Sequence, residues 1–371
     1  MKKALIHDWY YVNGGAEKVI KSINTIYQDF DHYALVDFLD KKDREDILNG
    51  ASVQTSFIQK LPTAKTNHRK FLQLFPYAIE QFDLSDYDLI VSSSAAISKG
   101  VLSKTDQLHI CYCHSPMRYA WDLYHQYLKE ENFGYLKNIY AKYVLHKMRI
   151  WDRINSDRVD IFIANSNYVK NRIKKIYRRD AVVVYPPVDV EQFKLCEIKD
   201  DYYFTASRMV PYKKISLIVE AFKKMPSKQL IVAGDGPKFN SIKSKASSNT
   251  TFLGNVEYSK LINYMSKAKA FVFAAEEDFG IIPVEAQACG TPVIGYNKGG
   301  LTETVIHKKT GFLFDHQTTE SIEHAVKEFE KLSFDPILIR ENAERFSKVR
   351  FEKEFEKIVN DAYSKFKNNC Y

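Results

Sequence analysis

Residues 277–300 read EDFGIIPVEAQACGTPVIGYNKGG, and they contain two carboxylates, Glu277 and Glu285, that stand eight residues apart. The apolar run KAFVFAA, residues 269–275, precedes them and has the length of a buried strand. The pattern IIPVEAQA that follows predicts a helix with Pro283 in its first turn. Glu277 is then expected on the loop at the carboxyl end of a strand, where open α/β sheets bind ligands. Glu285 follows about two turns into the helix, so one ligand roughly 10 Å long could touch both carboxylates.

The chemistry of such a loop suits phosphate and sugar groups. A helix that begins near residue 280 presents backbone N–H groups and a partial positive charge to an anion, and carboxylates accept hydrogen bonds from hydroxyls. The alternative is that Glu276, Glu277 and Asp278 merely favour a helix N-terminus, while Glu285 is a solvated helix residue. The residues by themselves leave both interpretations open.

The same residues, 277–300, resemble the donor-sugar signature of family 4 glycosyltransferases, retaining enzymes with the GT-B fold. The resemblance implies that Glu277 binds hydroxyls of the donor sugar and that Glu285 binds the nucleotide ribose. It also implies that backbone amides between them hold sugar or phosphate, and these amides belong to Phe279, Gly280 and Ile281. The implied fold class is α/β, with two doubly wound Rossmann-like domains that face each other across a cleft. The implied chemistry needs no metal and no other cofactor, because the nucleotide sugar is a substrate.

The length of 371 residues is enough for two domains of ordinary size. The prolyl stretch PPVD, residues 186–189, is the expected boundary, so we predict an amino-terminal, acceptor-side domain over 1–187 and a nucleotide-sugar-binding domain over 188–350. A closing helix is expected over 351–366. In GT-B enzymes the last helix commonly crosses back to the first domain, and the resemblance implies the same here.

The amino-terminal half alternates apolar runs of strand length with helical patterns, which predicts a parallel sheet. Strands are expected over 3–7, 32–39, 89–93, 108–113, 160–165 and 181–185. Gly14 and Gly15 follow the first of them and allow close backbone approach to a ligand, although a tight turn explains them equally well. The resemblance implies that this loop lies across the cleft from the donor diphosphate. His114 follows the fourth strand, and the resemblance implies that it approaches the donor sugar. The run HSPMRYAWD that begins at His114 resembles bacterial mannosyltransferases that use GDP-mannose.

The carboxyl-terminal half alternates in the same way, with strands expected over 202–207, 229–233 and 251–253 and helices over 215–224, 238–246 and 259–268. Arg208 and Lys213 follow the first strand and supply two cations suited to a departing diphosphate, or they are ordinary surface cations. The resemblance implies the former, with Lys214 as the adjacent alternative to Lys213. It also implies that Asn255 and Val256 lie near the nucleotide base.

Composition and short motifs bear on the cellular compartment of the protein and on its possible partners. The five cysteines lack the paired spacing of a zinc site, and neither a signal peptide nor an apolar run of membrane-spanning length is apparent, so we expect a cytoplasmic protein with free thiols. The formal charge of +8 leaves contact with an anionic membrane open, through the basic segments 65–82 or 168–179, each of which could equally be a core helix with a solvated basic face. No stacking motif of a nucleic-acid-binding module is present. Asp86 and Asp88 form a D-x-D at the amino end of a strand, where a turn is expected rather than a metal site.

The resemblance implies a metal-independent hexosyltransferase that moves mannose from GDP-mannose to a lipid-linked glycan acceptor, as in the synthesis of O-antigen, capsule or a related polysaccharide. Its expected location is the cytoplasm, with peripheral contact at the inner face of the plasma membrane. Three alternatives remain: a UDP-sugar-dependent transferase of the same family, a sugar-nucleotide epimerase or phosphorylase, and a non-catalytic protein that binds nucleotide sugars or glycans.

Overall fold

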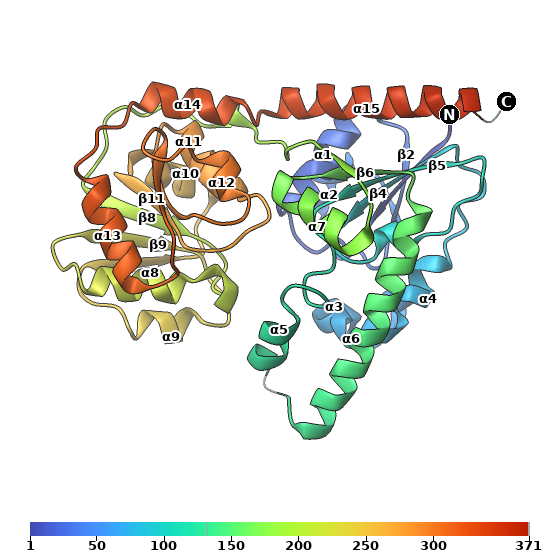
Figure 1. Ribbon diagram of the computed structural model, residues 1–371, viewed down its shortest axis with the longest axis horizontal. Helices are drawn as coiled ribbons and strands as arrows, with labels where there is room; N and C mark the ends of the chain where they lie inside the picture. The colour runs from blue at the N-terminus through green and yellow to red at the C-terminus, as the bar shows by residue number, and fades with distance from the viewer. Residues whose placement is uncertain (132, 370–371) are drawn as a thin grey trace. The chain divides into compact units, whose positions relative to one another are not determined.

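The computed structural model describes residues 1–131 and 133–369, and the chain divides into two compact units (Figure 1). The first unit contains residues 1–187 and 351–371, and the second contains residues 188–350. The chain passes from one to the other at Pro187 and returns after Arg350.

The first unit is built on a seven-stranded parallel sheet with the strand order β3-β2-β1-β4-β5-β6-β7. Its strands are β1 (Lys3–His7), β2 (Phe30–Ala34), β3 (Val53–Thr55), β4 (Leu89–Ser94), β5 (Leu108–Cys113), β6 (Ile161–Ala164) and β7 (Ala181–Val183). β1, β4 and β5 are buried along their whole length, as expected for central strands that helices cover on both faces.

The helices of the first unit fill the connections between these strands. They are α1 (Gly15–Ile26), α2 (Lys41–Leu48), α3 (Ala64–Asn67), α4 (Phe75–Glu80), α5 (Tyr124–Glu131), α6 (Tyr135–Asn155), α7 (Asn167–Tyr177) and the carboxyl-terminal α15 (Lys348–Asn369). One apolar cluster joins Ile20 of α1 and Leu5 of β1 to Phe351 and Phe355 of α15. A second cluster places Ile6 against Met148 of α6, on the other face of the sheet. The closing helix therefore packs its apolar side against the core of the first unit.

The second strand differs from the sequence-based expectation. A strand was expected over 32–39, but β2 ends at Ala34. The buried residues that follow leave the sheet because they pair with the loop after β1: the Leu35 amide donates to Asp8, and the Val36 carbonyl accepts from Tyr10. The buried residues 32–36 are continuous in sequence, but residues up to Ala34 pair with strands, whereas Leu35 and Val36 pair with the loop after β1.

The second unit is built on a six-stranded parallel sheet with the order β10-β9-β8-β11-β12-β13. Its strands are β8 (Tyr202–Ala206), β9 (Gln229–Ala233), β10 (Thr250–Gly254), β11 (Ala270–Phe273), β12 (Val293–Tyr296) and β13 (Gly311–Phe314). Its helices are α8 (Ile215–Lys223), α9 (Phe239–Lys243), α10 (Tyr258–Lys267), α11 (Ile281–Ala288), α12 (Leu301–Thr304), α13 (Thr319–Phe329) and α14 (Pro336–Glu344). The helix expected over 238–246 is thus shorter than expected.

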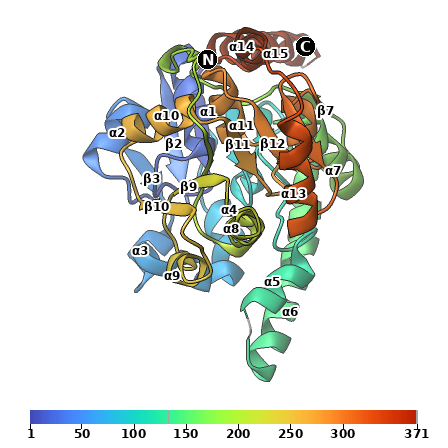
Figure 2. The same cartoon turned by 90° about the vertical axis from the view of Figure 1, so that its left-hand side faces the viewer.

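Successive side chains of a strand point to opposite faces, and this alternation divides the second core in two. Tyr203 of β8 packs with α8 and α13, whereas the next residue, Phe204, packs with α10 and α11. Helices therefore cover both faces of the sheet, with α8 and α13 on one side and α10 and α11 on the other (Figures 1 and 2). This is a doubly wound arrangement, so the expected fold class is observed in both units.

Three further observations concern the cysteines, the helices and the metal-binding side chains of the described residues. The cysteines at 111, 113, 196 and 289 are free thiols, and Cys370 lies outside the described residues. Among the helices of residues 1–131 and 133–369, none combines the length and the apolar character that a bilayer crossing requires. Over the same residues, no three His, Cys, Asp or Glu side chains form a group suited to a metal ion.

Candidate functional site

The strand order of the second unit creates a switch point between β8 and β11. From β8 the chain builds the sheet in one direction through β9 and β10, and from β11 it builds in the other direction through β12 and β13. The loops that leave β8 and β11 at their carboxyl ends therefore lead to helices on opposite faces of the sheet, and a switch point of this kind is where doubly wound sheets bind ligands. Arg208 and Lys213 lie on the first of these loops, and Glu277 lies on the second. Arg208 and Glu277, which are 69 positions apart in the sequence, therefore follow neighbouring strands at the same edge of the sheet.

Lys213 and Glu277 form an ion pair across this switch point, from Nζ to Oε1. Both side chains are largely shielded from water, with exposed fractions of 17% and 22%. Lys213 rather than Lys214 makes the pair, and Lys214 is the N-cap of α8, with a left-handed backbone at φ of 58°. A lysine ammonium has three donors, so Lys213 can bind Glu277 and still donate to another group.

The glycine pair after β12 holds the Glu277 loop from behind. Gly299 forms an isolated bridge with Glu277, and the Gly300 amide donates to the Glu277 carbonyl at 2.9 Å. A Cβ atom at Gly299 would lie 2.3 Å from that carbonyl oxygen, and a Cβ at Gly300 would lie 2.3 Å from the Cα of Phe279. Only glycine allows the two backbones to approach this closely. The NKGG end of the 277–300 stretch therefore positions its EDFG beginning.

The loop after β8 is packed by the same device. A Cβ atom at Gly234, in the GDGP turn after β9, would lie 2.0 Å from the Ser207 carbonyl oxygen, and Gly234 has φ of 112°. The backbone that carries Arg208 is therefore fixed by its neighbour. The Arg208 side chain itself is exposed, and within the part of the chain that the structure describes it has no ion-pair partner. It is a cation that remains available to an anionic ligand.

Helix α11 carries the second carboxylate of the stretch. Gly280 supplies the N-cap with a left-handed backbone, φ of 86°, and α11 begins at Ile281. Glu285 is buried, with 2% of its surface exposed, and Oε1 accepts a hydrogen bond from the Tyr258 hydroxyl at 3.2 Å. Burial and the neighbouring Glu285 raise the pKa of Tyr258 well above its ordinary value, so the hydroxyl stays protonated and remains a donor.

Helix α11 is braced by α14, which the sequence-based analysis did not anticipate. The Asn342 amide donates to Gln287 Oε1 at 2.7 Å and to the Thr304 carbonyl at 2.8 Å, and Arg340 donates to the Ala288 carbonyl at 2.7 Å. These bonds fix the helix that presents Glu285.

The two candidates for contact with a nucleotide base follow β10. Asn255 is exposed, whereas Val256 is partly buried and packs in the apolar cluster that also contains Phe273 and Ile282. Val256 thus has a packing role that explains its apolar side chain without a ligand.

The first unit has a switch point of its own, between β1 and β4. Asp8 follows β1 and is 2% exposed. Its carboxylate accepts three backbone hydrogen bonds from the loop after β4, at 2.7 Å from Ala95, 2.8 Å from Ile97 and 2.7 Å from Ser98. This carboxylate is fully engaged in holding the two loops together.

A buried polar chain connects the first-unit candidates Gly14 and His114. The Gly14 amide donates to Glu17 Oε2 at 3.1 Å, and Glu17 Oε1 lies 3.5 Å from His7 Nε2. His7 Nδ1 lies 3.2 Å from Ser93 Oγ, which in turn lies 2.8 Å from His114 Nε2. The structure therefore brings the glycine loop and His114 into one network, of which sequence reasoning identified only the two ends. Gly15 begins α1.

The two imidazoles of this network have opposite protonation behaviour. Burial lowers the pKa of His7, but its hydrogen bond to Glu17 and the charges of Glu17 and Asp8 outweigh burial, so the net pKa is raised. Burial and the neighbouring His7 lower the pKa of His114 to about 3. His114 is consequently a neutral ring at neutral pH, able to donate one hydrogen bond and accept one.

Two family models match the chain, one for each unit. Residues 14–192 match the model described as Glycosyltransferase Family 4, and residues 189–349 match the model described as Glycosyl transferases group 1. The expected family resemblance thus extends over both units.

Curated relatives match over about half of the chain. An uncharacterized glycosyltransferase of Methanocaldococcus jannaschii is 27% identical over 201 residues, which cover 52% of this chain and 55% of the relative. A GDP-mannose-dependent monoacylated alpha-(1-6)-phosphatidylinositol monomannoside mannosyltransferase of Corynebacterium glutamicum is 30% identical over 210 residues, which cover 48% of this chain and 54% of the relative. The chain therefore spans about half the length of these relatives.

Solved structures match over almost the whole chain. A crystal structure of Anabaena HepE in complex with UDP has a TM-score of 0.69 and 18% sequence identity, and the match covers 97% of this chain and 100% of that one. At this identity the likeness establishes the fold, which is GT-B, as expected from the sequence. Each unit therefore resembles a glycosyltransferase family model in sequence, and the chain has the GT-B fold.

Proposed function

We propose that the chain is a retaining glycosyltransferase that uses a nucleotide-sugar donor, bound at the β8–β11 switch point of the second unit. The single observation that carries this proposal is the pair of loops that meet there, with Arg208 and Lys213 from one loop and Glu277 from the other. A diphosphate requires cations and backbone donors, and a sugar requires carboxylate acceptors, and this edge provides both.

Each residue has a role in this proposal. Arg208 and the donors of Lys213 not used by Glu277 bind the diphosphate and stabilise the charge that it gains on leaving. The backbone amides at Phe279, Gly280 and Ile281 bind phosphate or sugar, and Glu277 binds sugar hydroxyls. Glu285, with Tyr258 beside it, accepts from the ribose hydroxyls. Asn255 is the exposed candidate beside the base.

In the first unit, His114 donates or accepts one hydrogen bond to the donor sugar as a neutral ring, and the backbone at Gly14 and Gly15 approaches the diphosphate. Transfer breaks the bond between the sugar anomeric carbon and the phosphate oxygen, and the acceptor oxygen bonds to the same carbon on the same face. The acceptor proton passes to a phosphate oxygen of the departing nucleoside diphosphate. No group of the protein is assigned as a covalent nucleophile.

GDP-mannose is the proposed donor and a lipid-linked glycan the proposed acceptor. Support for mannose comes from the run HSPMRYAWD and from the GDP-mannose-dependent relative of Corynebacterium glutamicum. The HepE structure holds UDP, so the GT-B fold itself is compatible with either nucleotide, and a UDP-sugar is the second candidate.

Calorimetric titration of the chain with GDP, UDP, GDP-mannose and UDP-glucose, each with magnesium and with a chelator, tests the donor. The proposal expects selective binding of GDP and GDP-mannose that the chelator does not alter. Selective binding of UDP would overturn the donor, and binding that needs magnesium would overturn metal independence. If no nucleotide binds, the switch point of the second unit is not a donor site.

A matched pair of variants tests the role of Glu277. Glu277→Gln removes the charge that pairs with Lys213. Glu276→Gln removes the adjacent charge of the same loop, which pairs at 3.2 Å with Lys298 of the loop after β12. We expect Glu277→Gln to lower the rate of sugar transfer by about 100-fold or more, and Glu276→Gln to leave it within a few-fold of the original. Equal effects of the two substitutions would contradict the assignment.

A further inference from the structure

Helix α6 has an outer face that the rest of the described chain does not cover. Its inner face packs Val144, Leu145 and Met148 into the core of the first unit. Its outer face nevertheless carries large apolar side chains that are between 45% and 81% exposed, namely Tyr135, Leu136, Ile139, Tyr143, Ile150 and Ile154. In Figures 1 and 2 the amino-terminal end of α6 extends away from the sheet of the first unit. A helix that is apolar on two opposite faces normally has a partner on both.

Within residues 133–155 the exposed charges are all positive, and Arg153 pairs with Asp157 just beyond the helix. Residues 133–155 contain five Lys or Arg side chains, and their single acid, Asp152, is fully buried. Asp152 pairs with the equally buried Lys99 and accepts hydrogen bonds from Trp121 at 2.7 Å and from Tyr177 at 3.0 Å. No acidic side chain between residues 133 and 155 therefore neutralises the outer face.

The basic side chains flank the apolar ones along the helix. Lys142 and Lys147 are exposed, and the Lys147 ammonium lies 5.6 Å from the centre of the Tyr143 ring. Long lysine side chains of this kind can place their stems on an apolar surface and their charges at its polar boundary. The pattern repeats at the carboxyl-terminal half of the helix.

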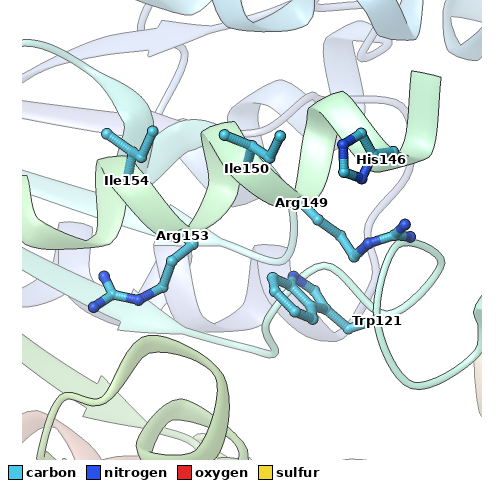
Figure 3. A pocket seen from close by; sticks show the side chains of 6 residues that line it. All are labelled: Trp121, His146, Arg149, Ile150, Arg153 and Ile154. Carbon is cyan, nitrogen blue, oxygen red and sulfur yellow. The ribbon is translucent and has the colours of Figure 1, made fainter. Parts of the chain in front are cut away.

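There, a hollow of about 400 Å³ is lined by Trp121, His146, Arg149, Ile150, Arg153 and Ile154. Figure 3 shows Ile150 and Ile154 on one side of the helix and Arg149 and Arg153 on the other, toward Trp121. Arg149 donates to the Ala120 carbonyl at 3.0 Å and Arg153 to Asp157 at 2.9 Å, so these two cations are held in place by the protein. Exposed apolar side chains and cations therefore occur at both ends of α6.

We propose that the outer face of α6 docks on an anionic lipid bilayer. Exposed aromatic and aliphatic side chains that alternate with Lys and Arg are the composition of helices that lie in the membrane interface. Charge complementarity selects this occupant over a second copy of the chain, because a symmetric contact through α6 would bring cations against cations. The proposal does not depend on the sugar-transfer reaction.

The two basic segments that the sequence offered for membrane contact are less suited to it. In 65–82, the apolar residues Phe75 and Ile79 are buried in the core. In 168–179, Val169 and Ile173 are buried likewise, and none of the exposed large apolar side chains falls in that range. Within 65–82 Tyr77 is the one large apolar side chain that is mostly exposed, and 168–179 has none, whereas α6 exposes several beside its basic residues.

Flotation of the full chain with lipid vesicles tests the proposal. One set of vesicles contains phosphatidylcholine alone, and the other contains three parts of phosphatidylcholine to one part of phosphatidylglycerol, each at low and at high salt. We expect binding to the anionic vesicles, weakened by salt, and little binding to the neutral ones. Failure to bind anionic vesicles at low salt would overturn the proposal.

Two pairs of variants locate the contact. Lys142→Gln with Lys147→Gln should lower the partition coefficient by about 30-fold, which is equivalent to roughly 1 kcal/mol for each charge. The control, Lys174→Gln with Lys175→Gln, removes two exposed charges of α7 and should change the partition coefficient less than about twofold. Leu136→Ser with Ile139→Ser should lower the partition coefficient by about tenfold or more. The control Ile337→Ser with Leu338→Ser, a pair on α14 that is more than half exposed, should not.

The outcomes are distinct from those for the proposed function. Nucleotide binding measured by calorimetry should be unchanged in all four double variants, because none of their residues is assigned to the donor site. Equal losses for the test and control pairs would overturn the docking surface. Binding of a polynucleotide that depends on Lys142 and Lys147, without binding to vesicles, would replace the lipid surface by nucleic acid and also overturn it.

Discussion

Replacing Gly299 by alanine should damage the proposed donor site without unfolding the protein. The new Cβ would lie 2.3 Å from the Glu277 carbonyl oxygen, whereas ordinary van der Waals contact begins near 3.4 Å. The two backbones must therefore separate by about 1 Å, because neither group is a flexible side-chain end. The displaced element is the loop that presents Glu277 to the proposed donor sugar. A misplacement of about 1 Å at a catalytic site costs on the order of 100-fold in rate, and we expect kcat/KM to fall by about that factor.

The cost to stability should be smaller and can be separated. Gly299 has φ of 73°, and an alanine in this conformation costs roughly 1–2 kcal/mol. For a unit of this size the melting temperature should then fall by about 2–8 °C. Gly50→Ala is the matched control, because Gly50 has φ of 78° and its Cβ would meet only the end of the Glu45 side chain. The control should melt at a similarly reduced temperature and keep its full activity.

The assay is donor turnover, as transfer or as hydrolysis of the nucleotide sugar, measured beside thermal unfolding for both variants. If Gly299→Ala kept its kcat/KM within about threefold while melting like Gly50→Ala, the loop would tolerate the displacement. The inference that glycine at 299 positions Glu277 would then be wrong.

Three further predictions follow from polar side chains described above or buried in the core. Tyr258→Phe should weaken nucleotide binding by a few-fold and Glu285→Gln by about tenfold, and calorimetry on the single and double variants should give non-additive losses because the two side chains share a hydrogen bond. Burial lowers the pKa of His109 to about 4, below the value of about 6.5 in an unfolded chain. The free energy of unfolding should therefore fall as the pH drops from 6.5 toward 4, by about 2 kcal/mol at pH 5. Chemical denaturation of His109→Asn should show a smaller fall over the same pH range. Lys99→Met should cost about 3–5 kcal/mol of unfolding free energy, because it removes one partner of a fully buried ion pair. A loss under about 1 kcal/mol in chemical denaturation would contradict this reasoning.

The fold was accessible from the sequence because its signals are local. Apolar runs of strand length and helical patterns alternate, and the short runs at 108–113 and 229–233 have the bounds of β5 and β9. The short strands β12 and β13 were not predicted, because their apolar runs, PVIGY and GFLF, lie close to glycines that are typical of turns. Local propensity identifies elements but not the partner of each buried residue, as the early end of β2 illustrates.

The candidate site was accessible only in part, because its key contacts join distant residues. The sequence placed Glu277 after a strand and Lys213 after another, and both positions are as expected. That the two form an ion pair depends on the order of strands in the sheet, which no local pattern contains. The hydrogen bond between Tyr258 and Glu285 also joins distant residues, so no local pattern predicts it. The outer face of α6 was not predicted because the sequence does not show which apolar side chains of a helix the rest of the chain covers.

Each unit has a carboxylate at its switch point, and the two carboxylates differ in their hydrogen-bond partners. At each switch point an acidic side chain connects two loops that diverge from neighbouring strands. In the first unit Asp8 is 2% exposed and accepts three backbone hydrogen bonds, so its lone pairs are used within the protein. In the second unit Glu277 is partly exposed and pairs with one flexible lysine, an arrangement that a ligand can enter by sharing both partners. A carboxylate saturated by backbone N–H groups stabilises loops, whereas one paired with a lysine can also recognise hydroxyls, and this difference is why we assign the donor to the second unit.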